Sequence, residues 1–79
     1  MTRTYKLFKM DAKGKPKLVK TYSNIFEPMY YVRRDIGLPK FQKCQINDIH
    51  DGALLIGNVF MLDGKKIFEI TKEIDWQGE

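Results

Sequence analysis

The sequence predicts a small, single α+β domain in which two antiparallel hairpins bracket one main helix. Three observations lead to this class: two Lys-rich β-forming stretches at the start, a capped helical stretch in the middle, and an Asp-Gly turn between two apolar stretches near the end. With 79 residues and 43% hydrophobic content, the chain can fold as one domain around a thin core. We therefore expect residues 1–79 to form one domain, ordered ββα(α)ββ, with a mostly antiparallel sheet packed on the main helix.

The first hairpin is predicted from residues 3–10 and 17–22, which mix β-forming residues with lysines. Residues 11–16 separate them, and there Gly14 can supply a positive φ, whereas Pro16 cannot lie inside a central strand. The alternation is imperfect, because both faces of the first stretch carry apolar side chains. The sequence therefore predicts the hairpin but leaves its buried face open.

The main helix is predicted to follow Ser23-Asn24. Asn24 and Glu27 have the spacing of a capping box, and Pro28 falls in the first turn, where a helix tolerates proline. Gly37 is expected to end the helix in the left-handed αL conformation, and Pro39 prevents its continuation. Four apolar residues recur at spacings of four, three and four, which places them on one face: Ile25, Met29, Val32 and Ile36.

The second half begins with an ambiguous stretch. Residues 40–48 could form a short helix anchored by Phe41 and Cys44, or a short extended segment. In the stretch from Asn47 to Asp51, the Asn and Asp side chains are interpreted as capping a turn, with Asp51-Gly52 marking it.

The last hairpin is the clearest β signal in the chain. Residues 53–62 read as a largely buried strand in which Gly57 marks a bulge or a close approach of the backbone. Asp63-Gly64 is a two-residue hairpin signal, and residues 65–74 form the return strand. Its buried face is expected to carry Phe68, Ile70, Lys72 and Ile74, with Lys72 as the exception to the alternation. Trp76 is expected to fold back as a lid.

The residues with catalytic chemistry are sparse and isolated. His50, the one histidine, could serve as a metal ligand or base with Asp48 or Asp51, and Cys44 could be a nucleophile only with His50 as its base. The glycines are too far apart for a phosphate-cradling loop. We therefore expect a protein that is not an enzyme and that has no metal and no cofactor.

No run approaches the roughly 18 apolar residues of a membrane span, and the start of the sequence lacks the apolar region of a secretory signal. A single cysteine cannot form an internal disulfide. These features predict a cytoplasmic protein with no membrane partner.

Charge is the strongest hint of function. The net charge is +4, but residues 1–20 contribute +6 and residues 61–79 contribute −2. Such asymmetry favours a polyanion partner, although lysines on exposed strands also protect edges from aggregation. The candidate binding residues are Lys6, Lys9, Lys13, Lys15, Lys17, Lys20, Arg33, Arg34, Lys40, Gln42 and Lys43.

Aromatic residues lie beside these basic ones. Tyr5, Phe8 and Tyr22 interleave with the hairpin lysines, and Tyr30-Tyr31 precede the two arginines. Exposed rings can stack on bases while lysine and arginine neutralise phosphates. Because most of these rings are needed in a small core, we expect at most two of the five to be free for a ligand.

Ten residues between Tyr5 and Leu62 follow one another in the order of a known family pattern: Tyr5, Asp11, Gly14, Lys15, Ser23, Gly37, Phe41, Cys44, Gly57 and Phe60. Through them this stretch resembles the nuclease-associated modular DNA-binding domain that is appended to homing endonucleases. The main helix is about one turn longer than in that family, and the terminal hairpin after Asp63 lies outside the pattern. The resemblance implies a DNA-reading segment after Gly37, with Lys40, Gln42, Lys43 and Gln45 directed at DNA.

Two functions follow as hypotheses. The first is a nucleic-acid-binding module that uses the Lys-rich hairpin together with Arg33 and Arg34. The alternative is a protein-binding inhibitor or adaptor that contacts an acidic protein surface, for example a phage-type protein that blocks a host defence or a CRISPR effector. The oligomeric state is left open under both hypotheses.

Overall fold

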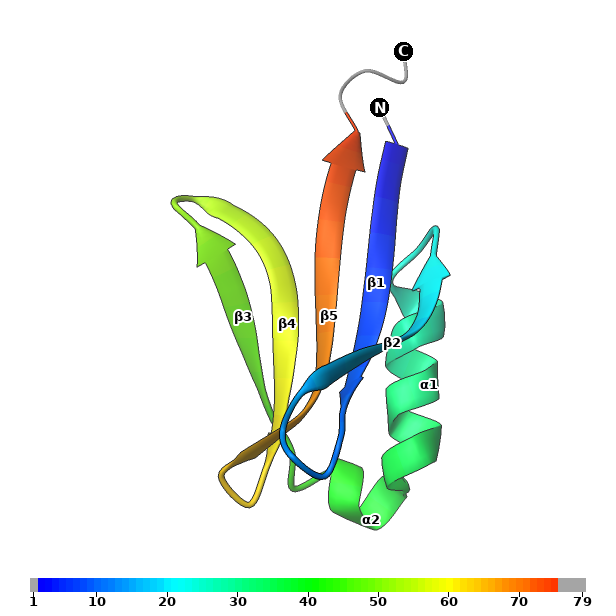
Figure 1. The fold of residues 1–79 in the computed structure, drawn as a ribbon, viewed down its shortest axis with the longest axis vertical. Helices are drawn as coiled ribbons and strands as arrows, with labels where there is room; N and C mark the ends of the chain where they lie inside the picture. Colours follow the sequence, from blue (N-terminus) through cyan, green and yellow to red (C-terminus); the bar gives the residue numbers. More distant parts are fainter. Residues whose placement is uncertain (1, 76–79) are drawn as a thin grey trace.

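The structure is a computed structural model that describes residues 2–75, with the side chains of residues 3–74. Two helices cover one face of a five-stranded antiparallel sheet (Figure 1). In chain order the elements are β1 (Thr2–Met10), β2 (Pro16–Tyr22), α1 (Phe26–Ile36), α2 (Leu38–Phe41), β3 (Gln45–Asp51), β4 (Leu54–Leu62) and β5 (Lys65–Asp75). The α+β class is confirmed, and the two predicted hairpins lie in the predicted places.

The predicted order ββα(α)ββ lacks one strand. The stretch interpreted as a turn, from Asn47 to Asp51, belongs to β3 and pairs with β4 from Gln45↔Met61 to Asp51↔Leu54. That prediction was wrong because β3 is an edge strand with mostly exposed side chains, so its polar residues resemble a turn. The chain turns at Gly52 and Ala53, one residue later than the predicted turn at Asp51-Gly52.

The strands are ordered β2-β1-β5-β4-β3, so the last strand of the chain is the central one. β5 pairs antiparallel with β1 on one side and with β4 on the other. Pro16 begins the edge strand β2, where its missing N–H costs no ladder bond. The sheet therefore joins the N-terminal hairpin to the C-terminal three-stranded meander through β5.

The core lies between α1 and the three inner strands. Its fully buried hydrophobic residues, among those described, are Leu7, Val32, Phe60, Phe68 and Ile70. The predicted inner face of the helix is confirmed, because Ile25, Met29 and Ile36 pack against this cluster beside Val32. Tyr5 packs on the same side as Leu7, so the structure assigns the buried face of β1 that the sequence left open.

The ends of α1 follow the local sequence signals only in part, and the helix begins at Phe26 with Ile25 as its N-cap. The Asn24 side chain accepts a hydrogen bond from the Glu27 backbone N–H (2.9 Å) and donates one to the Glu27 carboxylate (3.0 Å). Pro28 lies in the first turn and is buried. Gly37 has the predicted positive φ, +87°, but its ψ of 146° lies outside the αL region, so that detail of the prediction was wrong.

One turn and one strand glycine of the last hairpin also follow the sequence. Asp63 and Gly64 both have positive φ (53° and 76°), as a two-residue hairpin turn requires. Gly57 is buried where β4 approaches β5 so closely that a Cβ would overlap the carbonyl oxygen of Ile70. A register shift lies next to it in the β3–β4 ladder, between Ile49 and His50. Both the close approach and the bulge therefore occur here.

α1 has 11 residues, and no helix among residues 2–75 is long and apolar enough to cross a membrane. The predicted position of Trp76 lies outside the described residues.

Candidate nucleic-acid interface

Several segments that are distant in sequence meet at one end of the molecule. The β1–β2 turn, the C-terminal end of α1, α2 and the β4–β5 turn all lie at the lower end in Figure 1, while the start of β1 and the end of β5 lie at the opposite end. A hollow of about 250 Å³ joins them, because its lining comes from β1, α1, α2, β4 and β5. The fold therefore gathers these segments around a common surface.

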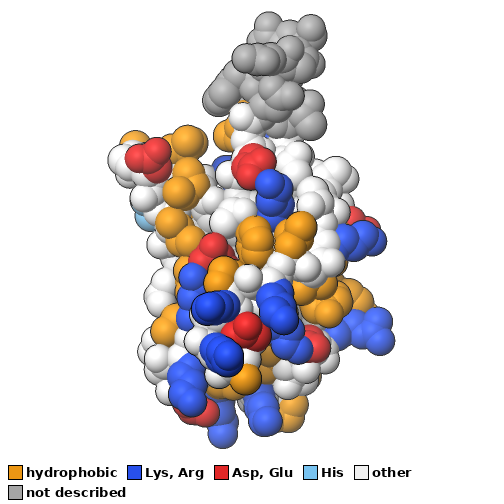
Figure 2. Space-filling model, in the orientation of Figure 1, with side chains coloured by type: hydrophobic (Ala, Val, Ile, Leu, Met, Phe, Trp, Pro, Cys, Tyr) orange, Lys and Arg blue, Asp and Glu red, His pale blue; other side chains and the backbone are white. Residues whose placement is uncertain are grey.

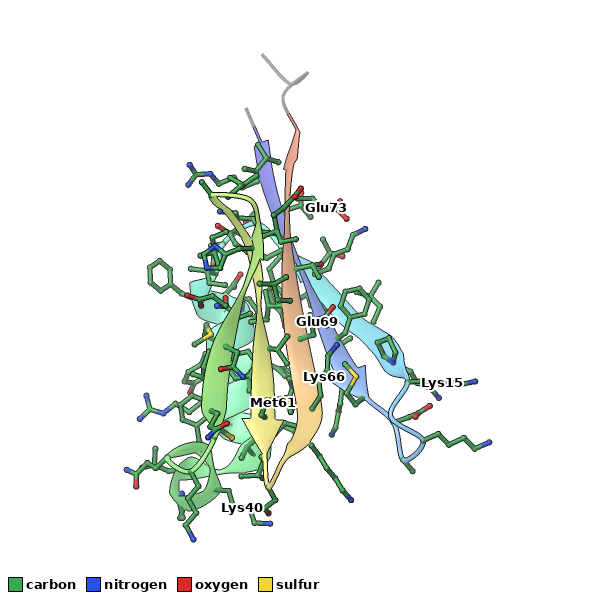
Figure 3. The ribbon with its side chains drawn as sticks, turned by 90° about the vertical axis from the view of Figure 1, so that its left-hand side faces the viewer. Lys15, Lys40, Met61, Lys66, Glu69 and Glu73 are labelled. Carbon is green, nitrogen blue, oxygen red and sulfur yellow. The ribbon has the colours of Figure 1, made fainter. Side chains whose placement is uncertain are left out.

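These segments and the residues that adjoin them carry most of the basic side chains, and we call this end of the molecule the basic end. Its members are Lys9, Lys13, Lys15, Lys17, Arg33, Arg34, Lys40, Lys43, Lys65 and Lys66. Most of the Lys and Arg side chains visible in Figure 2 gather over this half of the molecule. Figure 3 shows Lys15, Lys40 and Lys66, which come from three separate segments, in the same lower half, with Glu73 near the other end of β5.

Two predicted residues lie apart from this surface. Lys6 is on the sheet face opposite the helices and forms an ion pair with Glu73 (3.0 Å). Lys20 lies farther along β2, paired with Leu7, and its ammonium is 5.4 Å from the centroid of the Tyr22 ring. The remaining predicted lysines and arginines, and the exposed Gln42, belong to the basic end or adjoin it.

Salt bridges restrain only part of the basic end. The Lys9 ammonium is 3.1 Å from the Asp35 carboxylate and 5.7 Å from the centroid of the Phe68 ring, so it fastens β1 to the last turn of α1. Lys66 forms an ion pair with Glu69. Within residues 3–74, no carboxylate lies within 4 Å of the ammonium or guanidinium of the others, namely Lys13, Lys15, Lys17, Arg33, Arg34, Lys40, Lys43 and Lys65.

The β1–β2 turn holds its lysines on a fixed loop. The Asp11 carboxylate accepts hydrogen bonds from the backbone N–H groups of Lys13 (2.8 Å) and Lys15 (2.9 Å). The bond from Lys15 is the main cause that lowers the pKa of Asp11, although partial desolvation opposes it. Because the acidic side chain is engaged by the backbone, the lysine side chains of the turn are left exposed to solvent.

The sequence-based prediction missed Lys65 and Lys66. Residues 61–79 have a net negative charge, so the charge pattern along the sequence did not indicate the last hairpin as part of a basic surface. β5, however, runs antiparallel to β1, and its ladder with β1 begins at Phe68 beside Lys9, so the start of β5 lies at the same end of the sheet as the basic turn. The two lysines after Asp63-Gly64 were a visible signal, but only the β1–β5 pairing assigns them to this surface.

The segment after Gly37 is only partly helical. α2 ends at Phe41, so it contains Lys40 but not Gln42 or Lys43, and Gln45 is already the first residue of β3. These side chains are exposed. The DNA-reading role that the family resemblance implies for them stays a prediction.

The structure separates the two residues that could have formed a nucleophile and its base. Cys44 precedes β3 and His50 lies near its far end, six residues and about 20 Å along a strand. Burial raises the pKa of the Cys44 thiol, and the Asp63 carboxylate raises it further. The thiol contacts the carbonyl oxygen of Lys40 (3.6 Å). A Cys–His pair therefore cannot form in this fold.

The acidic cluster around His50 has a structural role. The Asp48 carboxylate accepts a hydrogen bond from the Asn58 side-chain amide (2.8 Å), which links β3 to β4. Among the described residues, no three His, Cys, Asp or Glu side chains are grouped as ligands of a metal ion.

Comparison with family models, curated proteins and solved structures finds no match to this chain.

Proposed function

We propose that this chain is a non-enzymatic nucleic-acid-binding module that contacts the phosphate backbone through its basic end. The observation that carries the proposal is that basic side chains from the β1–β2 turn, α1, α2 and the start of β5 gather at one end of the molecule. Lysine and arginine side chains that lack a carboxylate partner can replace the counterions of a phosphate backbone. They would do so without reading the base sequence.

The competing carboxylates at this end support the same function. Asp11 is engaged by backbone N–H groups, Asp35 by Lys9, and Glu69 by Lys66. These three are therefore already satisfied within the fold. The Asp63 carboxylate, in the β4–β5 turn, has no cation within 4 Å among the described residues, but the basic side chains outnumber these four carboxylates, so an incoming phosphate still meets a surplus of positive charge.

The test is a fluorescence-anisotropy titration of labelled generic oligonucleotides from 50 to 300 mM salt. A triple variant, Lys13→Gln with Lys15→Gln and Lys17→Gln, is compared with a matched triple, Arg3→Gln with Lys6→Gln and Lys72→Gln. Both lose three positive charges, but only the first loses them from the basic end. If all three turn lysines contact phosphates, the slope of log affinity against log salt falls by about 2–3 in the first variant. Equal effects of the two triples, or wild-type binding that does not respond to salt, would overturn the proposal.

A protein partner is the second candidate, and the outer edge of the sheet favours it. β3 is an edge strand with a free backbone ladder, and Ile46, Leu54 and Leu55 on β3 and β4 are exposed by 37–48%. An exposed edge can add a strand from another protein. A one-to-one complex with a single host protein in gel filtration, unaffected by nuclease treatment and abolished by Ile46→Lys, would support this function.

A further inference from the structure

We propose that the outer face of α1 binds the bases of single-stranded nucleic acid, in an aromatic groove that continues from the basic end. The inference rests on the proposed function and names the form of nucleic acid that it selects. The groove has a volume of about 780 Å³ and lies between the end of β2 and α1. Its walls are formed by Tyr22, Phe26, Tyr30 and Tyr31, and Arg34 and Asp35 lie at the end nearest the basic end.

Two of these aromatic side chains are far more exposed to solvent than rings that pack against the core. Phe26 is 79% exposed and Tyr30 is 60% exposed. They are four residues apart on α1, so they lie one above the other on the same face, separated by about 6 Å along the axis. An exposed ring offers its face to any base, because every base has a π-face. The two rings therefore form a stacking surface of about one helical turn.

The other two rings are partly used by the fold. Tyr31 makes an edge-to-face contact with Phe68, with ring centroids 6.3 Å apart, and Tyr22 packs against the core. Phe26 and Tyr30 are therefore the rings available for stacking. Of the five aromatic residues considered from sequence, Tyr5, Phe8 and Tyr22 are half-buried, whereas Tyr30 and Tyr31 are exposed. Phe26 was not among these five.

The charges around the groove fit a single strand of nucleic acid rather than an apolar ligand. The Arg34 guanidinium lies 5.7 Å from the centroid of the Tyr30 ring, at the end of the groove that joins the basic end. The Lys20 ammonium lies 5.4 Å from the centroid of the Tyr22 ring, apart from the basic end and outside the groove lining. The Asp35 carboxylate at the same end is neutralised by Lys9. Phosphates are therefore attracted at the end of α1 that joins the basic end.

The opposite end of the groove carries an acidic side chain. Glu27 lines the groove beside Phe26, and its carboxylate accepts a hydrogen bond from Asn24 but has no cationic partner among the described residues. Phosphates are disfavoured there and bases are not. A bound nucleic-acid strand is thus oriented with its phosphates at Arg34 and its bases over Phe26 and Tyr30. Stacked duplex bases cannot reach these rings, so the groove selects unpaired nucleotides.

The test compares a labelled 12-mer of deoxythymidine with a blunt 12-base-pair duplex, both titrated with the full chain. Phe26→Ala and Tyr30→Ala should each weaken single-strand binding by about 5- to 100-fold, leave duplex binding unchanged, and leave the salt slope unchanged. Phe26→Tyr keeps a ring and should retain the wild-type affinity. Leu18→Ala removes an apolar side chain outside the groove whose exposure, 55%, is close to that of Tyr30, and it is the control.

The outcomes separate this inference from the function on which it rests. If the alanine variants bind both oligonucleotides like the wild type with salt-sensitive affinity, the groove inference is wrong and the basic-end function stands. Equal weakening for strand and duplex also overturns the groove inference. If the wild type binds neither oligonucleotide at 50 mM salt, the proposed function fails. If it then binds a proline-rich peptide in a manner that requires Phe26, the groove is a peptide site instead.

Discussion

Among the described glycines, Gly57 is the one at which an added methyl group should lower the free energy of unfolding most. A Cβ there would lie well under 3.0 Å from the carbonyl oxygen of Ile70, a backbone atom of the central strand. Ile70 is fully buried and pairs with Leu7 on its other side, so this carbonyl cannot rotate away as a flexible side chain would. Normal contact requires the two strands to separate by about 1 Å, which disturbs the β4–β5 pairing and the core together.

The expected cost of Gly57→Ala can be estimated from these facts. Overpacking in cores typically costs about 1–3 kcal/mol, and the rigid obstacle places this case near 3 kcal/mol. A chain of this length has a total unfolding free energy of about 4–12 kcal/mol. The loss corresponds to a decrease in Tm of about 12–24 °C. Replacing glycine by alanine also lowers the entropy of the unfolded chain, and this alone would stabilise the fold by about 0.4–1 kcal/mol. The net destabilisation expected for Gly57→Ala is therefore opposite in sign to this entropic contribution.

Urea denaturation and thermal melting followed by circular dichroism measure this effect. The matched control is Gly52→Ala, in the β3–β4 turn, where φ is +63° and no atom lies within 4 Å of the added carbon. Only backbone strain of about 1 kcal/mol is expected there. If Gly57→Ala proves no less stable than Gly52→Ala, the close approach of the two strands is refuted.

Three further predictions concern single side chains. Asn24→Ala removes the hydrogen bond that Asn24 accepts from the Glu27 backbone N–H in the first turn of α1, together with its side-chain bond to the Glu27 carboxylate. It should lower the unfolding free energy by about 1 kcal/mol, measured by urea denaturation, while Ser23→Ala should have little effect. The pKa of Asp11 is depressed below its usual value of 3.8 in the folded chain. The ionised Asp11 carboxylate therefore stabilises the fold at pH values above 3.8, and this stabilisation is lost as the pH falls through the folded pKa. An NMR titration of the Asp11 carboxyl with a midpoint at or above 3.8 would contradict this prediction. The raised pKa of Cys44 predicts slow alkylation at pH 7–8 by iodoacetamide, accelerated when urea unfolds the chain; equal rates in the folded and unfolded chain would show that the thiol is not shielded.

Features encoded within a few residues could be predicted from the sequence. The Asp63-Gly64 turn requires positive φ at neighbouring positions, and few residues other than Gly, Asn and Asp adopt it. The Asn24–Glu27 cap depends on two side chains three positions apart. Both are local interactions, and their residues are sufficient to specify them.

Features that depend on strand order could not be predicted. β3 appeared to be a turn, because an edge strand with exposed faces lacks the apolar alternation of an inner strand. Lys65 and Lys66 join the basic end only because β5 pairs with β1, a contact between opposite ends of the chain. The groove was missed in part because Phe26 looked like an ordinary apolar residue of a helix that has a good inner face. Neither composition nor spacing determines which apolar residue of such a helix remains exposed.

The central position of β5 has a consequence for synthesis on the ribosome. Until residues 65–75 have emerged, the N-terminal hairpin and the β3–β4 hairpin have no strand between them, and Leu7 and Phe60 lack the two side chains, Phe68 and Ile70, that complete their cluster. Native packing must therefore wait for the last strand, and these long-range pairings favour slow folding. During that interval the lysines of β1 and β2 protect the unfinished hairpin, because like charges oppose edge-to-edge association of nascent chains.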